Sequence, residues 1–469
     1  MITITEGTPP EPLKPERAAA RGRAATAPGR AGRPYMRARV PQLALERLLG
    51  RFRSFYAQPG FRILVLLNIV LGFAYSFVAP FLSMFGTQEV GMSKLRFGVF
   101  MTLTAGGGVL IGTVLARFSD LHFSRRSMLI LGSVAGMAGY IGFAFCRSYV
   151  PLLLIGTTVL GVSTITFSQL FAHAHEVLRA TDIAPSQRAF YMNAFRMFLA
   201  LSWTIGPMIA AWVMLRFSYR GLFLCAAGNF ALFALVAARF VPAAPPPFAR
   251  QAAKGSRSLW KLLARFDLLA HMAAMALIFA ATTMNMVNLP LLILDTLRGT
   301  KLDVGITYSV APVFELPCML YFGWLATRRE TAGILRLGML IAVVYYAALT
   351  LVVRPWQIYP CQILSAAMTA VVSGVAITYF QNHLPHHPGT ATNLYANAQR
   401  VGSTAGYFLF GAIAEHAGYR AVFGLCAVCA LLAFGLMFVP VQAEHPEDGE
   451  PVDEESAAEP LGFAASQGV

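Results

Sequence analysis

Apolar stretches of roughly 20 residues, the length that spans the hydrocarbon core of a bilayer as an α-helix, recur along almost the whole chain. No other feature constrains the fold as strongly. The stretches lie at residues 61–84, 95–116, 126–146, 150–173, 189–214, 219–241, 267–293, 303–326, 332–353, 356–380, 392–415 and 418–440. Of the 469 residues, 57% are hydrophobic and 13% are charged, values outside the usual range of water-soluble proteins. The sequence therefore predicts twelve transmembrane helices.

Ten-residue segments of alternating polarity, the pattern of a membrane β-barrel, are absent from the sequence, so we predict an all-α, polytopic membrane protein. The stretches form two groups of six, at 61–241 and 267–440. Residues 242–266 contain "PAAPPPFARQAAKGSRS" and are typical of a linker. We expect 1–60 to be a disordered basic arm with an amphipathic approach to the first helix, or an extension before a start near Met36, and 441–469 to be a disordered acidic tail.

The two groups resemble each other in sequence. "NAFR" at 193–196 is repeated as "NAQR" at 397–400, and "YRGLF" at 219–223 as "YRAVF" at 419–423. Gln169 and Gln381 likewise end corresponding stretches. The shared order and similar offsets predict a duplicated six-helix unit, so that the two halves are pseudo-symmetric.

The net charge of +15 does not point to nucleic acid, because the basic residues follow the even-numbered stretches. They include Arg117, Arg125, Arg126, Arg179, Arg188, Arg250, Lys254, Arg257, Lys261, Arg265, Arg328, Arg329 and Arg336. By the positive-inside rule this face is cytoplasmic. We therefore expect a multi-pass protein of the cell (inner) membrane with both termini in the cytoplasm.

Between the second and third stretches, "LARFSDLHFSRRSM" resembles the loop signature of the major facilitator superfamily. The resemblance implies a cytoplasmic charge clasp made by Asp120, Arg125 and Arg126. The usual glycine after the aspartate is missing, and a solvated basic loop that only sets topology is the alternative. The pair Gly206-Pro207 resembles the core of the antiporter signature on the fifth helix of that superfamily.

Five further segments together resemble a narrower family, the bacterial sugar efflux transporters. They are "FSQLFAHAHE" (167–176), "FRMFLALSWTIGP" (195–207), "MNMVNLPL" (284–291), "FELP" (314–317) and "YFQNHLPHHPGTATNLYANA" (379–398). The resemblance implies a twelve-helix carrier that exports sugars in exchange for protons. One position departs from the family pattern, since Asn288 stands where an aspartate is expected before the proline of the seventh helix.

Glu315 lies at the centre of the apolar segment "VAPVFELPCMLYF". A charge at the centre of a membrane helix costs about 2.5–3.5 kcal/mol on insertion scales, so such a residue faces a cavity or a partner. We predict that Glu315 loads and releases the coupled proton. The alternative is a neutral acid that donates to the carbonyl of Val313, which Pro317 leaves without its helical partner.

Arg196 and Arg400 occupy corresponding positions in the fifth and eleventh helices, and a guanidinium offers five donors to sugar hydroxyls or a carboxylate. We predict that Arg196 binds substrate; either arginine could instead extend towards the cytoplasmic surface. Amides at membrane depth, together with an aromatic platform, suit a polyhydroxylated ligand, the alternative being hydrogen bonds between helices. The predicted binding set is Gln169, Asn193, Arg196, Trp203, Asn285, Asn288, Gln381 and Asn397.

No enzyme, metal or cofactor signature is found in the sequence. His173 and His175 lie two residues apart, which places them on different helix faces, and the six cysteines are in or beside apolar stretches. A P-loop, HExxH and GxSxG are absent, so an enzyme and ATP-driven transport by this chain are not expected.

We therefore predict a secondary transporter that exports sugars by proton-coupled alternating access, with the sugar, protons and the lipid bilayer as its partners. The sequence leaves the oligomeric state open. An exporter of drugs or other amphiphiles is an alternative of the same class, because the chain contains 35 phenylalanines. A non-transporting membrane sensor is the alternative from another class.

Overall fold

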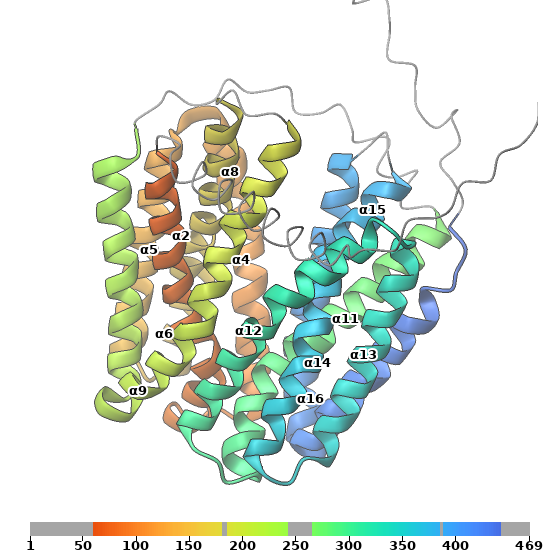
Figure 1. The fold of residues 1–469 in the computed structure, drawn as a ribbon. Helices are drawn as coiled ribbons and strands as arrows, with labels where there is room; N and C mark the ends of the chain where they lie inside the picture. Colours follow the sequence, from red (N-terminus) through yellow and green to blue (C-terminus); the bar gives the residue numbers. More distant parts are fainter. Residues whose placement is uncertain (1–59, 181–184, 243–264, 385–387, 442–469) are drawn as a thin grey trace, which may run out of the picture. The chain divides into compact units, whose positions relative to one another are not determined.

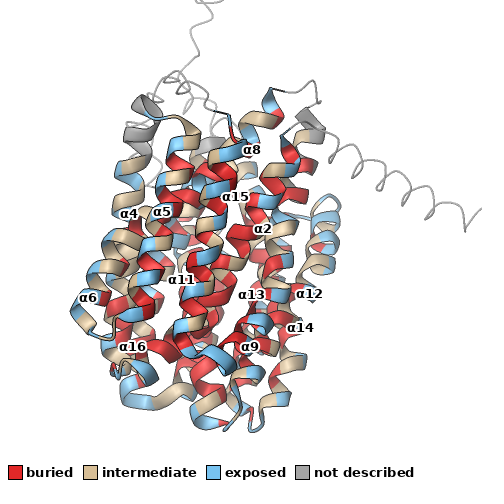
Figure 2. Ribbon diagram, turned by 90° about the vertical axis from the view of Figure 1, so that its left-hand side faces the viewer, coloured by how far each residue is buried: buried red, intermediate tan, exposed pale blue. Residues whose placement is uncertain are grey.

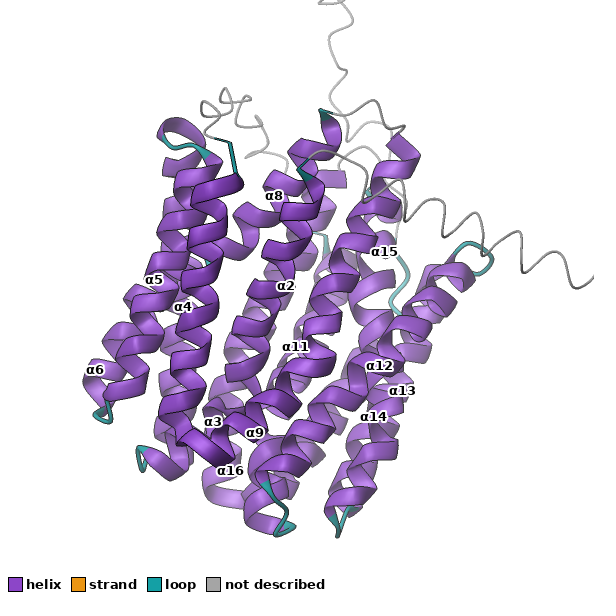
Figure 3. Cartoon of the chain, turned by 60° about the vertical axis from the view of Figure 1, so that its left-hand side comes forward, coloured by secondary structure: helices purple, strands orange, loops and turns teal. Residues whose placement is uncertain are grey.

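The structure, a computed structural model, describes residues 60–180, 185–242, 265–384 and 388–441, all of which belong to one unit, Phe55–Val469. Every regular element within these ranges is a helix, and none is a strand (Figure 3). The predicted all-α fold is confirmed. The predicted arm, nearly all of the linker and the acidic tail lie outside the described residues.

The N-terminal half, residues 60–242, contains the first eleven helical elements (Figure 1). These are α2 (Phe61–Val78), η1 (Ala79–Phe81), α3 (Leu82–Met84), η2 (Phe85–Glu89), α4 (Lys94–His122), α5 (Arg125–Phe145), α6 (Tyr149–Leu154), η3 (Ile155–Val159), α7 (Leu160–Ser163), α8 (Ile165–Arg179) and α9 (Pro185–Phe240).

The C-terminal half, residues 265–441, contains the remaining elements. These are α11 (Phe266–Leu291), η4 (Leu292–Thr296), α12 (Lys301–Ala326), α13 (Thr331–Leu351), η5 (Pro355–Gln357), α14 (Ile358–Ala370), η6 (Val371–Val375), α15 (Ala376–His383) and α16 (Pro388–Leu436). The helix α11 is buried along most of its length, whereas α4 and α12 expose more of their surface (Figure 2).

Ten segments of the described chain are long and apolar enough to cross a membrane. Two of them are 47 residues long, and each contains one residue with a non-helical backbone, Ser218 (φ 56°) in α9 and Gly418 (φ 82°) in α16. Dividing both segments at these residues turns ten spans into twelve. The described chain is thus consistent with the twelve predicted helices.

Close contacts between small residues fix the helices within each half. In the N-terminal half, Ser202 of α9 donates a hydrogen bond to the carbonyl of Ile69 in α2 (3.1 Å). A Cβ on Gly206 of α9 would lie 2.0 Å from the hydroxyl oxygen of Ser76 in α2. In the C-terminal half, a Cβ on Gly406 of α16 would lie 2.6 Å from the backbone oxygen of Ala280 in α11. Small residues thus let helix backbones approach in both halves, as is common in membrane bundles.

The halves meet where α9 packs on α12 and α4 packs on α16. A Cβ on Gly305 of α12 would lie 2.9 Å from the carbonyl oxygen of Pro207 in α9, and one on Gly98 of α4 would lie 2.7 Å from the Cα of Gly411 in α16. The two glycines belong to a repeat that our sequence analysis missed, "SKLRFGV" at 93–99 and "TKLDVGI" at 300–306. The two contacts are therefore related by the duplication.

The two ends of the bundle differ in how the halves are joined. We call the end that carries the turns at 123–124 and 327–330 the basic end, and the end that carries the turns at 90–93 and 297–300 the opposite end. Between described residues, every hydrogen bond, cation–π contact and aromatic pair that links the two halves lies towards the opposite end. The halves are therefore sealed at the opposite end.

Candidate functional site

One stripe of α9 runs from the seal towards the basic end and carries two predicted site residues. Arg196, Trp203, Pro207 and Ala211 are spaced by seven, four and four residues, so they share a helix face. Pro207 and Ala211 contact Gly305 of the other half and are buried, whereas Trp203 is half-buried and Arg196 is exposed. The face of α9 that packs against the other half near the seal is therefore exposed at Arg196.

A corresponding stripe of α16 carries Arg400, Tyr407 and Gly411, again spaced by seven and four residues. Gly411 is buried against Gly98 of α4, and Arg400 is exposed. Arg400 lies eleven residues from Gly411, or about 16 Å along the helix at 1.5 Å per residue. Arg196 lies the same eleven residues from Pro207. The two arginines thus project from opposite halves at the same depth below the seal.

Glu315 occupies the middle of α12, as its fifteenth of 26 residues. It lies ten residues from Gly305, or about 15 Å along the helix, which is the level of the two arginines. The side chain is half-buried and makes no hydrogen bond or ion pair with any described residue. It shares a helix face with Tyr308, whose hydroxyl donates to the carbonyl of Met286 in α11 (2.8 Å). A proton can therefore bind Glu315 without breaking a contact to a described residue.

Neither Arg196 nor Arg400 makes a hydrogen bond or ion pair with a described residue, so their donors are not used by that part of the chain. The guanidinium of Arg196 interacts electrostatically with Tyr395 of α16, which belongs to the other half. Asn397 is exposed on α16 less than one turn from Arg400. The side chain of Asn193, the corresponding residue of α9, lies outside the described part.

Four of the predicted amides bond to neighbouring helices. Asn288 is fully buried and donates to the carbonyl of Tyr419 (2.8 Å), which attaches α11 to the last part of α16. Asn285 accepts a hydrogen bond from the hydroxyl of Tyr345 in α13 (3.4 Å). Gln381 donates to the hydroxyl of Thr392 across α15 and α16 (3.1 Å). Each of these three amides therefore joins two helices of the C-terminal half.

Gln169, the fourth of these amides, belongs to a charged group at the basic end. Its Oε1 accepts from Arg125 of α5 (2.6 Å), and Nε and Nη2 of Arg125 both donate to one oxygen of Glu176 in α8 (3.0 and 2.9 Å). Arg126 donates to the carbonyl of Ala238 in α9. The two arginines of the predicted clasp thus fasten α5 to α8 and α9, and the side chain of Asp120 lies outside the described part. Our sequence analysis did not identify Glu176 as the partner of Arg125.

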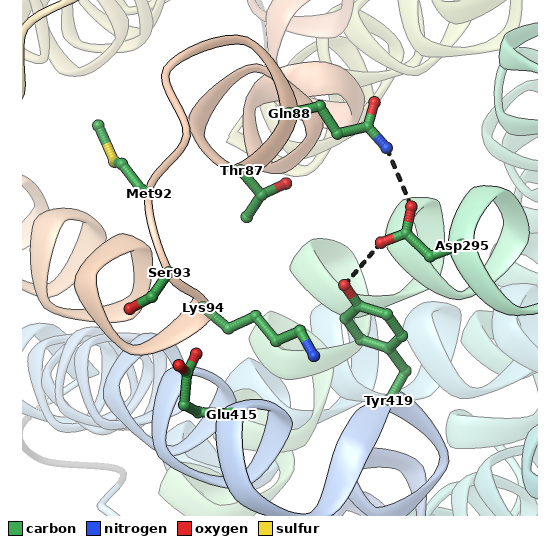
Figure 4. Close-up of a pocket in the computed structure, with 8 residues that line it drawn as sticks. All are labelled: Thr87, Gln88, Met92, Ser93, Lys94, Asp295, Glu415 and Tyr419. Carbon is green, nitrogen blue, oxygen red and sulfur yellow. Dashed lines mark hydrogen bonds between the residues drawn. The ribbon is translucent and has the colours of Figure 1, made fainter.

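The opposite end carries a polar pocket that sequence reasoning missed (Figure 4). Its volume is about 340 Å³, and it is lined by Thr87, Gln88, Met92, Ser93, Lys94, Asp295, Glu415 and Tyr419. The carboxylate of Asp295 accepts from Gln88 of the N-terminal half (3.0 Å) and from the hydroxyl of Tyr419 (2.7 Å). The pocket therefore lies across the seal between the halves. Among the described residues, no group of three or more metal-ligating side chains occurs.

Comparison with known proteins identifies the family to which the sequence belongs. The sequence matches the Major Facilitator Superfamily over residues 64–407 and 273–467. It is 33% identical to a Deinococcus radiodurans protein named as a sugar efflux transporter, over 80% of this chain and 96% of that protein. It is 29% identical to Sugar efflux transporter A of Dickeya chrysanthemi, over 79% of this chain and 92% of that protein.

Solved structures share the fold. A crystal structure of the nucleoside transporter NupG superposes with a TM-score of 0.68 at 12% identity, over 80% of this chain and 97% of that one. Transporters of this superfamily are carriers and not enzymes, in agreement with our sequence analysis. The family match and the sequence relatives thus lead to one conclusion: the chain belongs to the Major Facilitator Superfamily and, within it, to the family of sugar efflux transporters.

Proposed function

We propose that this chain exports sugars or sugar-like solutes across the cell (inner) membrane in exchange for protons. The observation that carries the proposal is the common level of Arg196, Arg400 and Glu315, which come from both halves and make no bond to described residues. Two guanidiniums offer ten N–H donors to the hydroxyl oxygens of a sugar. The names of the relatives point to the same substrate class.

In this proposal the basic end faces the cytoplasm, as the positive-inside rule predicts. A sugar enters from that end, where the faces of α9 and α16 are uncovered, and binds between Arg196 and Arg400. The halves then rock, so that the basic end closes and the opposite end opens. Trp203, on the same face of α9 as Arg196, provides an apolar surface for the sugar ring.

Glu315 couples the movement to protons in this scheme. Burial penalises the charged form of a carboxyl more than its neutral form, so the transition through a closed state is easier when Glu315 is protonated. A proton taken up at the opposite end is then released at the basic end. The proton gradient then drives the cycle in one direction, because Glu315 binds a proton more often from the side of lower pH.

The test is transport by the purified full-length chain in proteoliposomes with an imposed pH gradient. The panel contains monosaccharides, disaccharides, alkyl glycosides and cationic dyes. Sugar accumulation against its gradient, abolished by a protonophore, supports the proposal. Accumulation of dyes alone would replace it by drug export, and binding of sugar without flux would replace it by a sensor.

A further inference from the structure

The repeat "SKLRFGV"/"TKLDVGI" places two lysines at corresponding positions, Lys94 at the start of α4 and Lys301 at the start of α12. The repeat "YRGLF"/"YRAVF" likewise places Tyr219 and Tyr419 at corresponding positions. Each tyrosine directly follows the residue that breaks its long helix, Ser218 in α9 and Gly418 in α16. All four residues therefore lie at the opposite end.

Each lysine contacts the tyrosine of the other half. The Lys94 Nζ atom lies 4.5 Å from the ring centroid of Tyr419, and the Lys301 Nζ atom lies 5.1 Å from the ring centroid of Tyr219. Figure 4 shows the first pair, with the lysine amine directed at the ring. Both separations fall within the roughly 6 Å over which a cation is attracted to an aromatic face. The duplication has thus produced two equivalent bridges that cross between the halves in opposite directions.

A third cross-half contact lies between residues that also correspond to each other. Gln88 and Asp295 are separated by the same 207 positions as the two lysines, and each belongs to a π-helical turn, η2 or η4. Gln88 donates to Asp295 across the interface (3.0 Å). A residue that bonds to its own counterpart lies close to the pseudo-twofold axis that relates the halves. The hydrogen bond is therefore central, and the two lysine bridges are peripheral.

We propose that Lys94–Tyr419, Lys301–Tyr219 and Gln88–Asp295 together form the gate that closes the opposite end, and that all three contacts separate when that end opens. This inference rests on the proposed function for the direction of opening. A pseudo-symmetric gate releases both sides at once, because rocking of the two halves away from the pseudo-twofold axis moves corresponding residues by equal amounts. The lysines begin their helices, so water can solvate each ammonium when its ring withdraws.

The two sides of the gate are equivalent in position but differ in hydrogen bonding. The hydroxyl of Tyr419 donates to Asp295 (2.7 Å), and Lys94 also donates to the carbonyl of Ala414 (3.2 Å). The hydroxyl of Tyr219 is buried and has no hydrogen-bond partner among the described residues. Loss of the Lys94 bridge should therefore open the gate more than loss of the Lys301 bridge.

The test measures access to a cysteine that lies within the predicted site. Ala200 lies on the stripe of α9 between Arg196 and Trp203, and is half-buried. The variant Ala200→Cys of the full chain is treated with a membrane-impermeant charged maleimide in right-side-out and inside-out vesicles. Labelling above the background of the six native cysteines reports access from each side.

Lys94→Gln and Lys301→Gln should each raise the labelling rate from the opposite end by about two- to fivefold, the range of a single exposed cation–π contact, with the larger increase in Lys94→Gln. The double variant should raise it about five- to thirtyfold, and Lys→Arg at both positions should keep the parent rate, because arginine also binds an aromatic face. Arg96→Gln is the matched control: it removes a neighbouring exposed charge that makes no hydrogen bond, ion pair or cation–π contact with a described residue of the other half. It should leave the rate unchanged.

A parent rate in the double variant, or an equal increase in Arg96→Gln, would overturn the gate. If the double variant fails to insert, Tyr219→Leu together with Tyr419→Leu removes both bridges from the other side and must also raise the labelling rate above the parent rate; the Tyr419 change additionally removes the hydrogen bond to Asp295. Labelling needs neither sugar nor a proton gradient. If the chain transports no sugar but its variants show these increases in labelling rate, the proposed function is contradicted and the proposed gate is still supported.

Discussion

Replacement of Glu315 by glutamine should uncouple sugar movement from the proton gradient. Glu315 is the only aspartate or glutamate in the middle of a span among the side chains that the structure describes; the others lie near helix ends. One titrating acid at that depth predicts one proton per sugar. Glutamine has nearly the same shape and stays neutral, so it mimics the protonated form in both conformations. Glu315→Gln should therefore still exchange sugar for sugar.

The size of the effect follows from the proton count. One pH unit is equivalent to about 1.36 kcal/mol per proton, which is a tenfold concentration ratio. With a gradient of two pH units and the membrane potential clamped at zero, the parent should accumulate a neutral sugar up to about 100-fold, and Glu315→Gln only to equality. The assay is radiolabelled sugar uptake into proteoliposomes at steady state, together with counterflow exchange at equal pH.

Glu330→Gln is the matched control, because Glu330 is exposed in the turn between α12 and α13. It should accumulate sugar like the parent. Accumulation by Glu315→Gln that equals the parent's would remove Glu315 from the coupling role. A parent ratio near 10,000-fold would correspond to two protons per sugar and would show that a second acid titrates.

Three further predictions concern binding and packing. Arg196→Ala should weaken sugar binding about 10- to 100-fold in equilibrium dialysis, the range of one lost hydrogen bond to a charged group; unchanged affinity would make Arg196 structural. Gly406→Val should lower the free energy of unfolding by about 1–3 kcal/mol, because a Cβ at this position meets the backbone of α11. Gly435→Val should not lower it, because a Cβ there has no neighbouring atom within 4 Å; thermal unfolding in detergent compares the two variants. Arg125→Lys should restore little of the stability lost in Arg125→Ala, because lysine cannot donate to Glu176 and Gln169 through a rigid fork; equal stability of Arg125→Lys and the parent would count against that geometry.

The helices could be predicted from sequence because hydropathy reports burial in a bilayer directly. The break at Ser218 falls between the predicted fifth and sixth spans, and the break at Gly418 falls at the first residue of the predicted twelfth span. The depth of Glu315 followed from its place in an apolar run. Each of these features depends only on the order of residues along one helix, so it can be read from the sequence.

The partners of the amides could not be predicted in the same way. In a membrane helix the lipid-facing and protein-facing sides are both apolar, so periodicity does not tell which neighbour a polar side chain meets. Asn288 bonds to the break in α16, and Gln169 bonds to Arg125, 44 residues away. The repeat around Lys94 and Lys301 was also missed, because only a Lys-Leu pair and one glycine are identical in it.

The duplication produces a symmetric frame but an asymmetric distribution of acids. The frame consists of corresponding contacts, Gly98 with α16 and Gly305 with α9, and of Arg196 and Arg400 at equal depth. The counterpart of Glu315, 207 positions earlier in the continuous helix α4, is Gly108, where a Cβ would lie 3.3 Å from the side chain of Thr164.

The same asymmetry occurs at the seal, where the counterpart of Asp295 is the neutral Gln88. Both acids of these corresponding pairs thus belong to the C-terminal half, and in each pair the N-terminal half supplies a group that cannot ionise. Protonation of Glu315 therefore changes the charge of the C-terminal half only. Since a symmetric change would affect both halves alike, a proton on Glu315 distinguishes the two sides of the interface at the level of the predicted site.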